Sequence, residues 1–156
     1  MKLTVICMGK TRESFIRDGI DKYLGFLKHF ADTEIRELKE EKIYDLKEAP
    51  VIRKKEAERI FKALPAGSYL VSLDERGAEF TSHEFAAFMN GSLESGVREM
   101  VFVLGGAMGL DEEVIARSNK SIALSRWTLT HEMARLVLLE QLYRAFTIIK
   151  GKTYHY

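Results

Sequence analysis

The feature that most constrains this chain is the alternation of short apolar runs with longer stretches of helical spacing. Four runs have the length and the apolar content of buried strands: 3–8, 69–74, 100–104 and 121–125. A fifth, 33–38, alternates polar and apolar residues and is expected nearer a sheet edge. Apolar residues at helical spacing predict the intervening helices, over 12–30, 50–64, 81–93, 111–115 and 131–149. The order predicts an α/β fold with a mostly parallel sheet flanked by helices.

Particular residue types mark where several of these helices begin. Thr81 and Glu84 have the spacing of a capping box. Asp111 and Thr130 are well suited to cap the fourth and fifth helices. Pro50 fits the first turn of the second helix, where a missing N–H does no harm.

The connections between these elements indicate where a ligand would bind. The charged stretch 39–48 predicts a flexible connection, and residues 75–77 predict a turn that closes the strand 69–74. In parallel sheets ligands bind beyond the carboxyl ends of the strands. Loops leave such ends after Leu73, at Gly105 and at Ser125, so we expect a site there.

Length and composition indicate an ordinary globular domain. The 156 residues are 46% hydrophobic and 30% charged, which suits a single domain with a substantial core. The one cysteine, Cys7, excludes an intrachain disulfide and suits a reducing, cytoplasmic location. We expect no secretory leader and no membrane span, because no apolar segment approaches about 20 residues.

Charge is unevenly distributed along the chain. The formal net charge is +1, yet residues 117–156 hold seven basic and two acidic residues. That end of the chain is therefore strongly basic, and the remainder is net acidic. The asymmetry suggests an anionic partner such as a nucleic acid. A solvated helix face explains the same charges equally well.

The stretch VFVLGGAMGL, 101–110, runs from a predicted strand into a cluster of glycines. Its G-G-x-x-G spacing differs from the dinucleotide fingerprint, and no phosphate-binding G-x-x-x-x-G-K-[ST] occurs. A turn that allows close approach to the backbone remains, because glycine lacks Cβ. A helix-entry turn without a ligand fits the motif as well.

Metal and nucleophile chemistries find little support. In THEMAR, 130–135, Arg135 stands where a zinc motif would place a second histidine. Since the four histidines are scattered, we expect no metal. Cys7 lies within a predicted strand, where we expect it to act as a small, buried hydrophobic residue. Asp74 and Glu75 could serve as bases, although turn chemistry explains them equally well.

His131 and Arg135, four residues apart, share one face at the start of the last predicted helix. Helix N-termini favour anions, so this pair suits an RNA phosphate or base. The alternative is a capping histidine beside a surface arginine. The apolar stripe of that helix is wide enough to cover a partner subunit as well.

Several motifs together resemble one family closely. They are SLDERG at 72–77, VFVLGGAMGL at 101–110, ALSRWTLTHEMARLVLLEQLYRAF at 123–146 and the terminal TYHY. The chain is similar over its whole length, as one domain spanning 1–156, to the ribosomal RNA large subunit methyltransferase H family of the SPOUT class. The resemblance implies methyl transfer from S-adenosylmethionine to N3 of a pseudouridine, at position 1915 in the usual numbering of 23S rRNA.

The resemblance further implies a homodimer that acts on the large subunit or the assembled ribosome, and a trefoil knot in the C-terminal half. It assigns cofactor contacts to two strand-end residues and to a wrapping loop: Leu73, Gly105, Leu124, Ser125, Arg126, Trp127, Thr128 and Leu129.

A second group matches family positions placed for RNA or for the target base: His131, Arg135, Arg144, Tyr154 and His155. His155 or His131 would take the N3 proton, with Arg135 stabilising the developing anion. Thr130 stands where family members often have proline, and its capping ability should preserve the loop. The alternatives are a non-catalytic ribosome-binding or assembly factor and an unrelated nucleotide-binding α/β domain.

Overall fold

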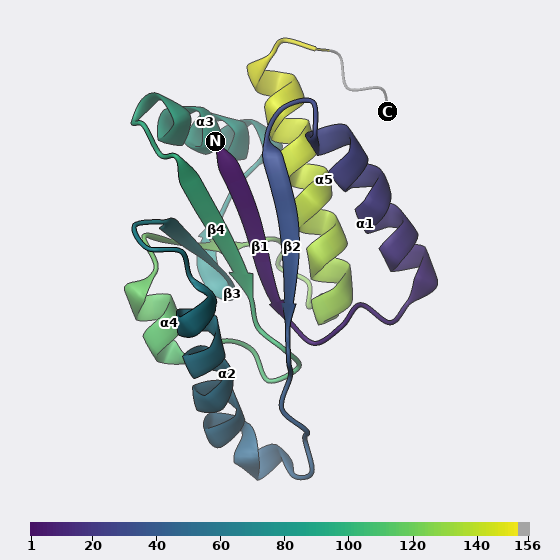
Figure 1. The fold of residues 1–156 in the computed structure, drawn as a ribbon, viewed down its shortest axis with the longest axis vertical. Helices are drawn as coiled ribbons and strands as arrows, with labels where there is room; N and C mark the ends of the chain where they lie inside the picture. Colours follow the sequence, from purple (N-terminus) through teal and green to yellow (C-terminus); the bar gives the residue numbers. More distant parts are fainter. Residues whose placement is uncertain (153–156) are drawn as a thin grey trace.

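Five parallel strands form one sheet in the computed structural model, which describes residues 1–152. The strand order is β2-β1-β4-β3-β5 (Figure 1). The strands are β1 (Lys2–Met8), β2 (Asp32–Leu38), β3 (Tyr69–Glu79), β4 (Glu99–Leu104) and β5 (Lys120–Ala123). The α-helices are α1 (Ser14–Leu27), α2 (Ala49–Ala63), α3 (Ser82–Glu94), α4 (Glu112–Arg117) and α5 (His131–Ile149). The predicted α/β class and the flanking helices are confirmed.

Helices cover both faces of the sheet, so the molecule has three layers (Figure 1). Side chains alternate along each strand. In β1, Val5 and Cys7 join the core beneath α1, α3 and α5, whereas Ile6 and Met8 join the core beneath α2 and α4. All four side chains are fully buried. Burial raises the pKa of the Cys7 thiol to about 11, which agrees with its predicted role as a small hydrophobe.

Local chemistry fixes the helix starts as the sequence indicates. The Thr81 hydroxyl accepts a hydrogen bond from the Glu84 N–H, and the Glu84 carboxylate accepts one from the Thr81 N–H, which completes the capping box. Asp111 caps α4 through the Glu113 N–H. Thr130 caps α5 through the Met133 N–H.

The predicted turn at 75–77 is wrong, because β3 continues to Glu79. A register shift against β5 between Leu73 and Ala78 accommodates the additional residues. Gly77 passes so close to β5 that a Cβ there would lie 2.5 Å from the Ile122 nitrogen. Glycine at this position therefore allows the late part of β3 to lie against β5.

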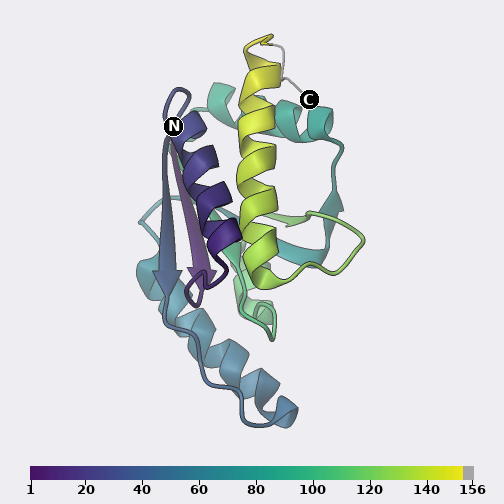
Figure 2. The same ribbon diagram turned by 90° about the vertical axis from the view of Figure 1, so that its right-hand side faces the viewer.

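Helix α5 lies between α1 and α3 and packs against both. Figure 2 shows α1 and α5 side by side on one face of the sheet. The ring of Phe26 in α1 lies 5.1 Å from that of Tyr143 in α5, and Phe30, just after α1, stacks on Phe146. Neighbouring helices thus account for much of the wide apolar stripe of α5.

The start of α5 lies at the edge of the sheet where the strands end (Figure 1). The connection 39–48 forms a 3₁₀ turn at Leu46–Glu48 and leads into α2. Within residues 1–152, none of the helices is long and apolar enough to cross a bilayer.

Candidate active site

A pocket of about 760 Å³ opens at the carboxyl edge of the sheet. Three separate segments line it: 73–76 within β3, 104–110 from the end of β4, and 128–131 before α5. Arg53 of α2 and Glu112 of α4 complete the wall. Parallel strands bring these loops to one edge, as the sequence predicts.

The glycine turn after β4 folds tightly on itself. The Gly109 N–H donates to the Gly106 carbonyl at 3.0 Å, and Gly109 has a φ of +76°, a region that favours glycine. A Cβ at Gly105 would lie 2.6 Å from the Gly109 oxygen and 2.8 Å from the Leu110 nitrogen. The close backbone approach predicted at this motif therefore lies within the turn itself, which forms the floor of the pocket.

Two side chains of helix α2, Arg53 and Glu56, lie against this turn. Arg53 donates to the Met108 carbonyl at 3.4 Å. Glu56 is buried and accepts a hydrogen bond from the Glu41 N–H at 3.0 Å through Oε1. Its Oε2 has no hydrogen-bond partner among the described residues and lies 3.1 Å from the position of a Cβ at Gly106. Burial raises the pKa of this carboxyl, against the hydrogen bond from Glu41.

Glu56→Gln is expected to increase stability at alkaline pH. A carboxyl whose pKa is raised above its ordinary value of 4.5 weakens the fold as pH rises and the group ionises. The variant should gain on the order of 1 kcal/mol over wild type in urea unfolding at pH 8, and nothing at pH 4. Glu58→Gln, at an exposed site of the same helix, is the control. A gain that did not change with pH would contradict this interpretation.

The rim of the pocket carries a chain of charges. Arg76 donates to Asp74 at 2.8 Å and forms an ion pair with Glu112 at 2.9 Å. The hydrogen bond from Arg76 holds the pKa of the Asp74 carboxyl below its ordinary value. Asp74 is therefore a poor general base. Three carboxylates and two guanidinium groups line the pocket, since Glu75 and Arg53 also reach it, and the excess of negative charge favours a cationic ligand.

His131 and Arg135 begin the same helix but face different surroundings. His131 lines the pocket and is partly exposed. Arg135 is fully buried and donates to the Met8 carbonyl at 2.5 Å and to the Thr11 hydroxyl at 2.8 Å. Its guanidinium also lies 3.5 Å from Glu37. This position gives Arg135 no surface for RNA, and its contacts instead hold α5 to the end of β1.

Glu132 fastens the same turn of α5 to the start of α1. Its carboxylate accepts hydrogen bonds from the N–H groups of Arg12, at 2.9 Å, and Glu13, at 3.1 Å. Burial opposes ionisation, but these two donors bring the pKa of Glu132 below its ordinary value. Sequence reasoning missed this contact because the partners lie about 120 residues away.

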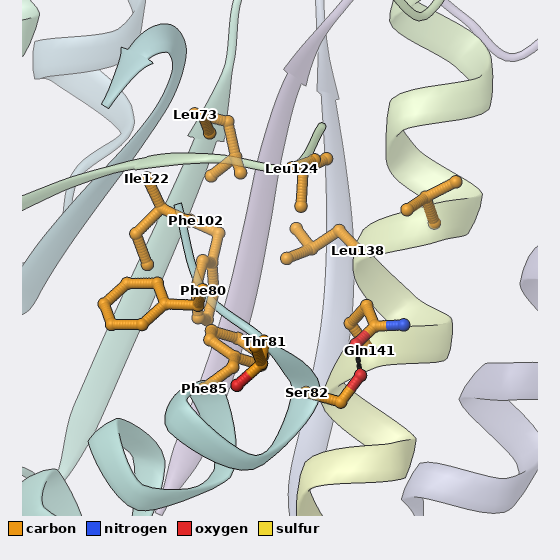
Figure 3. Close-up of a pocket in the computed structure, with 12 residues that line it drawn as sticks. Leu73, Phe80, Thr81, Ser82, Phe85, Phe102, Ile122, Leu124, Leu138 and Gln141 are labelled. Carbon is orange, nitrogen blue, oxygen red and sulfur yellow. Dashed lines mark hydrogen bonds between the residues drawn. The ribbon is translucent and has the colours of Figure 1, made fainter. Parts of the chain in front are cut away.

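The wrapping loop 124–129 divides between two cavities. Thr128 and Leu129 line the main pocket together with Leu73 and Gly105. Leu124 instead lines a smaller cavity of about 270 Å³ between α3, α5 and the sheet, shown in Figure 3. There Leu124 and Leu73 lie among apolar side chains.

The remaining loop residues line neither cavity. Trp127 is 84% exposed. Arg126 is exposed and pairs with Glu79 at 2.9 Å, and the Ser125 hydroxyl accepts from the Trp127 N–H. The structure thus brings together four of the eight predicted cofactor contacts.

Of the other predicted RNA contacts, Arg144 is described and does not line the pocket. Arg144 forms an ion pair with Glu140 at 2.6 Å on α5. Tyr154 and His155 lie outside the described residues. No cluster of histidine, cysteine, aspartate or glutamate in the described part of the chain could hold a metal ion.

Comparison with known proteins identifies the family of this chain. Residues 1–155 match the model described as "Predicted SPOUT methyltransferase". The ribosomal RNA large subunit methyltransferase H of Geobacter sulfurreducens is 47% identical, with all of both chains covered. Its counterpart from Geobacter metallireducens is also 47% identical, over all of this chain and 99% of the relative.

Two solved structures share the fold at low sequence identity. A probable methyltransferase from Bordetella pertussis Tohama I has a TM-score of 0.57 at 15% identity, over 93% of this chain and 96% of that one. A probable methylase family protein from Haemophilus influenzae Rd KW20 has a TM-score of 0.54 at 14% identity, over 99% and 70%. On the full-length matches in sequence, the chain belongs to the SPOUT methyltransferases, in the family of the ribosomal RNA large subunit methyltransferases H.

Proposed function

We propose that this protein transfers a methyl group from S-adenosylmethionine to N3 of a pseudouridine in the large-subunit ribosomal RNA. One observation carries the proposal: in a chain of this family, the glycine turn and residues 128–131 meet in one pocket at the carboxyl edge. The names of the relatives indicate the large-subunit RNA as the substrate. The pseudouridine and its N3 atom rest on the family resemblance.

The lining of the pocket fits adenosylmethionine. Its volume of about 760 Å³ lies in the range of small-molecule sites. Leu73, Leu104 and Leu129 offer apolar surface for an adenine ring, and the turn 105–109 offers main-chain groups for its polar edge. The excess of carboxylates suits a ligand with a positive sulfonium and would repel a phosphate.

The residues at the start of α5 would prepare the acceptor. Adenosylmethionine supplies, when bound, a methyl group that its positive sulfur has already activated. N3 of the base must lose its proton before its lone pair can form the new N–C bond as the S–C bond breaks. His131, which lines the pocket, would accept that proton, and His155 is the alternative. The pocket then contributes mainly by aligning the methyl group with N3 of the base.

The proposal includes a homodimer and the C-terminal trefoil knot. The knot, like the homodimer, rests on the family resemblance. The partner subunit would cover surface left free by the contacts of α5 with α1 and α3.

Transfer of tritiated methyl groups onto bacterial ribosomes that lack this modification tests the proposed function. We expect label in the 23S rRNA of the large subunit, located by nuclease digestion at N3 of a single pseudouridine. Calorimetry should show binding of adenosylmethionine, whereas a non-catalytic assembly factor would show no heat. Unlabelled RNA together with no heat would reject the proposal. If single-turnover transfer were unimpaired after replacement of His131 and His155 by alanine, only the role of these two histidines as bases would be rejected.

A further inference from the structure

The basic C-terminal segment offers few unpaired charges to RNA, because each of its four arginines is either ion-paired or buried. Arg117 pairs with Glu113, Arg126 with Glu79 and Arg144 with Glu140, and Arg135 is buried. Lys120 and Lys152 lie over phenylalanine rings, with the ammonium 5.4 and 5.3 Å from the ring centres. The end of α5 also lies far from the carboxyl edge (Figure 1). An RNA substrate at the pocket needs cations from another part of the chain.

A groove of about 670 Å³ supplies such cations beside the pocket. It lies where β1 and β2 end, between the loop 9–13 and the start of the connection 39–48. The charged side chains that line it, here called the basic groove, are Lys10, Arg12, Arg17, Glu37, Lys39 and Glu40. All four cations are exposed.

Both carboxylates of the basic groove are already engaged. Glu37 accepts hydrogen bonds from the N–H and the hydroxyl of Thr11, at 2.7 and 2.9 Å. Glu40 pairs with Arg12 at 2.5 Å. Within residues 1–152, the side chains of Lys10, Arg17 and Lys39 form no ion pair. These three cations therefore give the groove its positive character.

The first turn of α5 connects the groove to the pocket. His131 and Ala134 line the pocket, while Glu132 and Arg135 contact the loop that floors the groove. Strand β1, which leads to the groove, pairs directly with β4, which leads to the glycine turn. An RNA strand with its base at His131 would therefore pass the start of α5 and reach the groove.

We propose that the basic groove binds the sugar–phosphate backbone of the RNA substrate next to the target base; this rests on the proposed function. The carboxylate of Glu132 already accepts hydrogen bonds from the two N–H groups just before α1, those of Arg12 and Glu13. Phosphates would consequently meet the long side chains of Lys10, Arg17 and Lys39. Contacts of this kind position a strand without reading its sequence.

The test replaces the three unpaired cations together, as Lys10→Gln, Arg17→Gln and Lys39→Gln. Binding to purified bacterial large ribosomal subunits is measured over a series of salt concentrations. We expect affinity to fall about 10-fold at 0.1 M salt, and the slope of log K against log salt to become shallower by about two. Affinity for adenosylmethionine, measured by calorimetry, should not change.

A matched triple variant carries the same charge change elsewhere: Lys22→Gln, Lys28→Gln and Arg98→Gln, all at exposed sites away from the groove. It should bind subunits within 2-fold of wild type. The proposal would be overturned if both triple variants lost the same affinity for subunits, or if the slope of log K against log salt did not change in the groove variant. It would also be overturned if binding by the wild type did not depend on salt. If wild type binds subunits but transfers no methyl group, the proposed reaction fails, and the slopes still decide the role of the groove.

Discussion

Gly105→Ala is expected to reduce affinity for adenosylmethionine by about 100-fold, the effect of losing about two main-chain hydrogen bonds to the ligand. The new methyl group would lie 2.6 Å from the Gly109 oxygen and 2.8 Å from the Leu110 nitrogen. Both are backbone atoms, so no side chain can rotate to make room. The turn 105–109 must open, and with it the floor of the pocket.

Gly91→Ala is the matched control for this variant. A Cβ at Gly91 in α3 meets nothing within 4 Å. Since alanine favours a helix, the control should gain about 0.5–1 kcal/mol of stability and bind adenosylmethionine as wild type does. Calorimetry gives the affinities, and circular dichroism checks the fold. Wild-type affinity in Gly105→Ala would mean that the ligand does not lie on this turn.

The sequence predicts most of the elements because their signals are local. The strand β1 is mostly apolar, and Thr81, Asp111 and Thr130 each cap the helix that follows them. A cap requires only a side-chain oxygen two or three residues before a free N–H. Such information lies within one turn of chain, and so it can be read without tertiary structure.

The extent of β3 could not be predicted in the same way. Residues 75–77 have the composition of a turn, and nothing nearby indicates a strand. Leu73 and Ala78 on either side of them both pair with Ile122 of β5, which lies more than 40 residues later in the chain, and this pairing holds the residues between them in the strand. Gly77 is required by the backbone of Ile122 rather than by its own turn. Long-range pairing therefore overrides the local preference.

The position of the pocket was predictable, but its supporting contacts were not. Parallel strands place their loops at one edge, which is why Leu73, Gly105 and Leu129 meet. The roles of Glu56 beneath the turn and of Glu132 at α1 depend on distant partners, and neither has a sequence signature. Part of the charge of the basic segment 117–156 is offset by acidic residues outside it, because Arg117 pairs with Glu113 and Arg126 with Glu79.

Arg135→Met is expected to lower the free energy of unfolding by about 3 kcal/mol, within the range for loss of a buried charged network. Methionine retains the apolar stem but leaves the Met8 carbonyl without its donor at 2.5 Å. Thr11 loses the donor at 2.8 Å as well. Glu37 is partly exposed and regains water, so the loss stays below the upper limit for a stranded buried charge.

Arg126→Met is the control that distinguishes a structural role of Arg135 from a direct RNA contact. Arg126 is exposed and pairs only at the surface with Glu79, so the control should change stability by less than about 0.5 kcal/mol. Urea unfolding of both variants, followed by binding to large ribosomal subunits at a temperature where both are folded, distinguishes the two roles. If Arg135 held RNA directly, Arg135→Met would unfold like wild type and lose RNA affinity. The buried contacts predict the reverse: a marked loss of stability, and RNA affinity close to that of wild type while the fold persists.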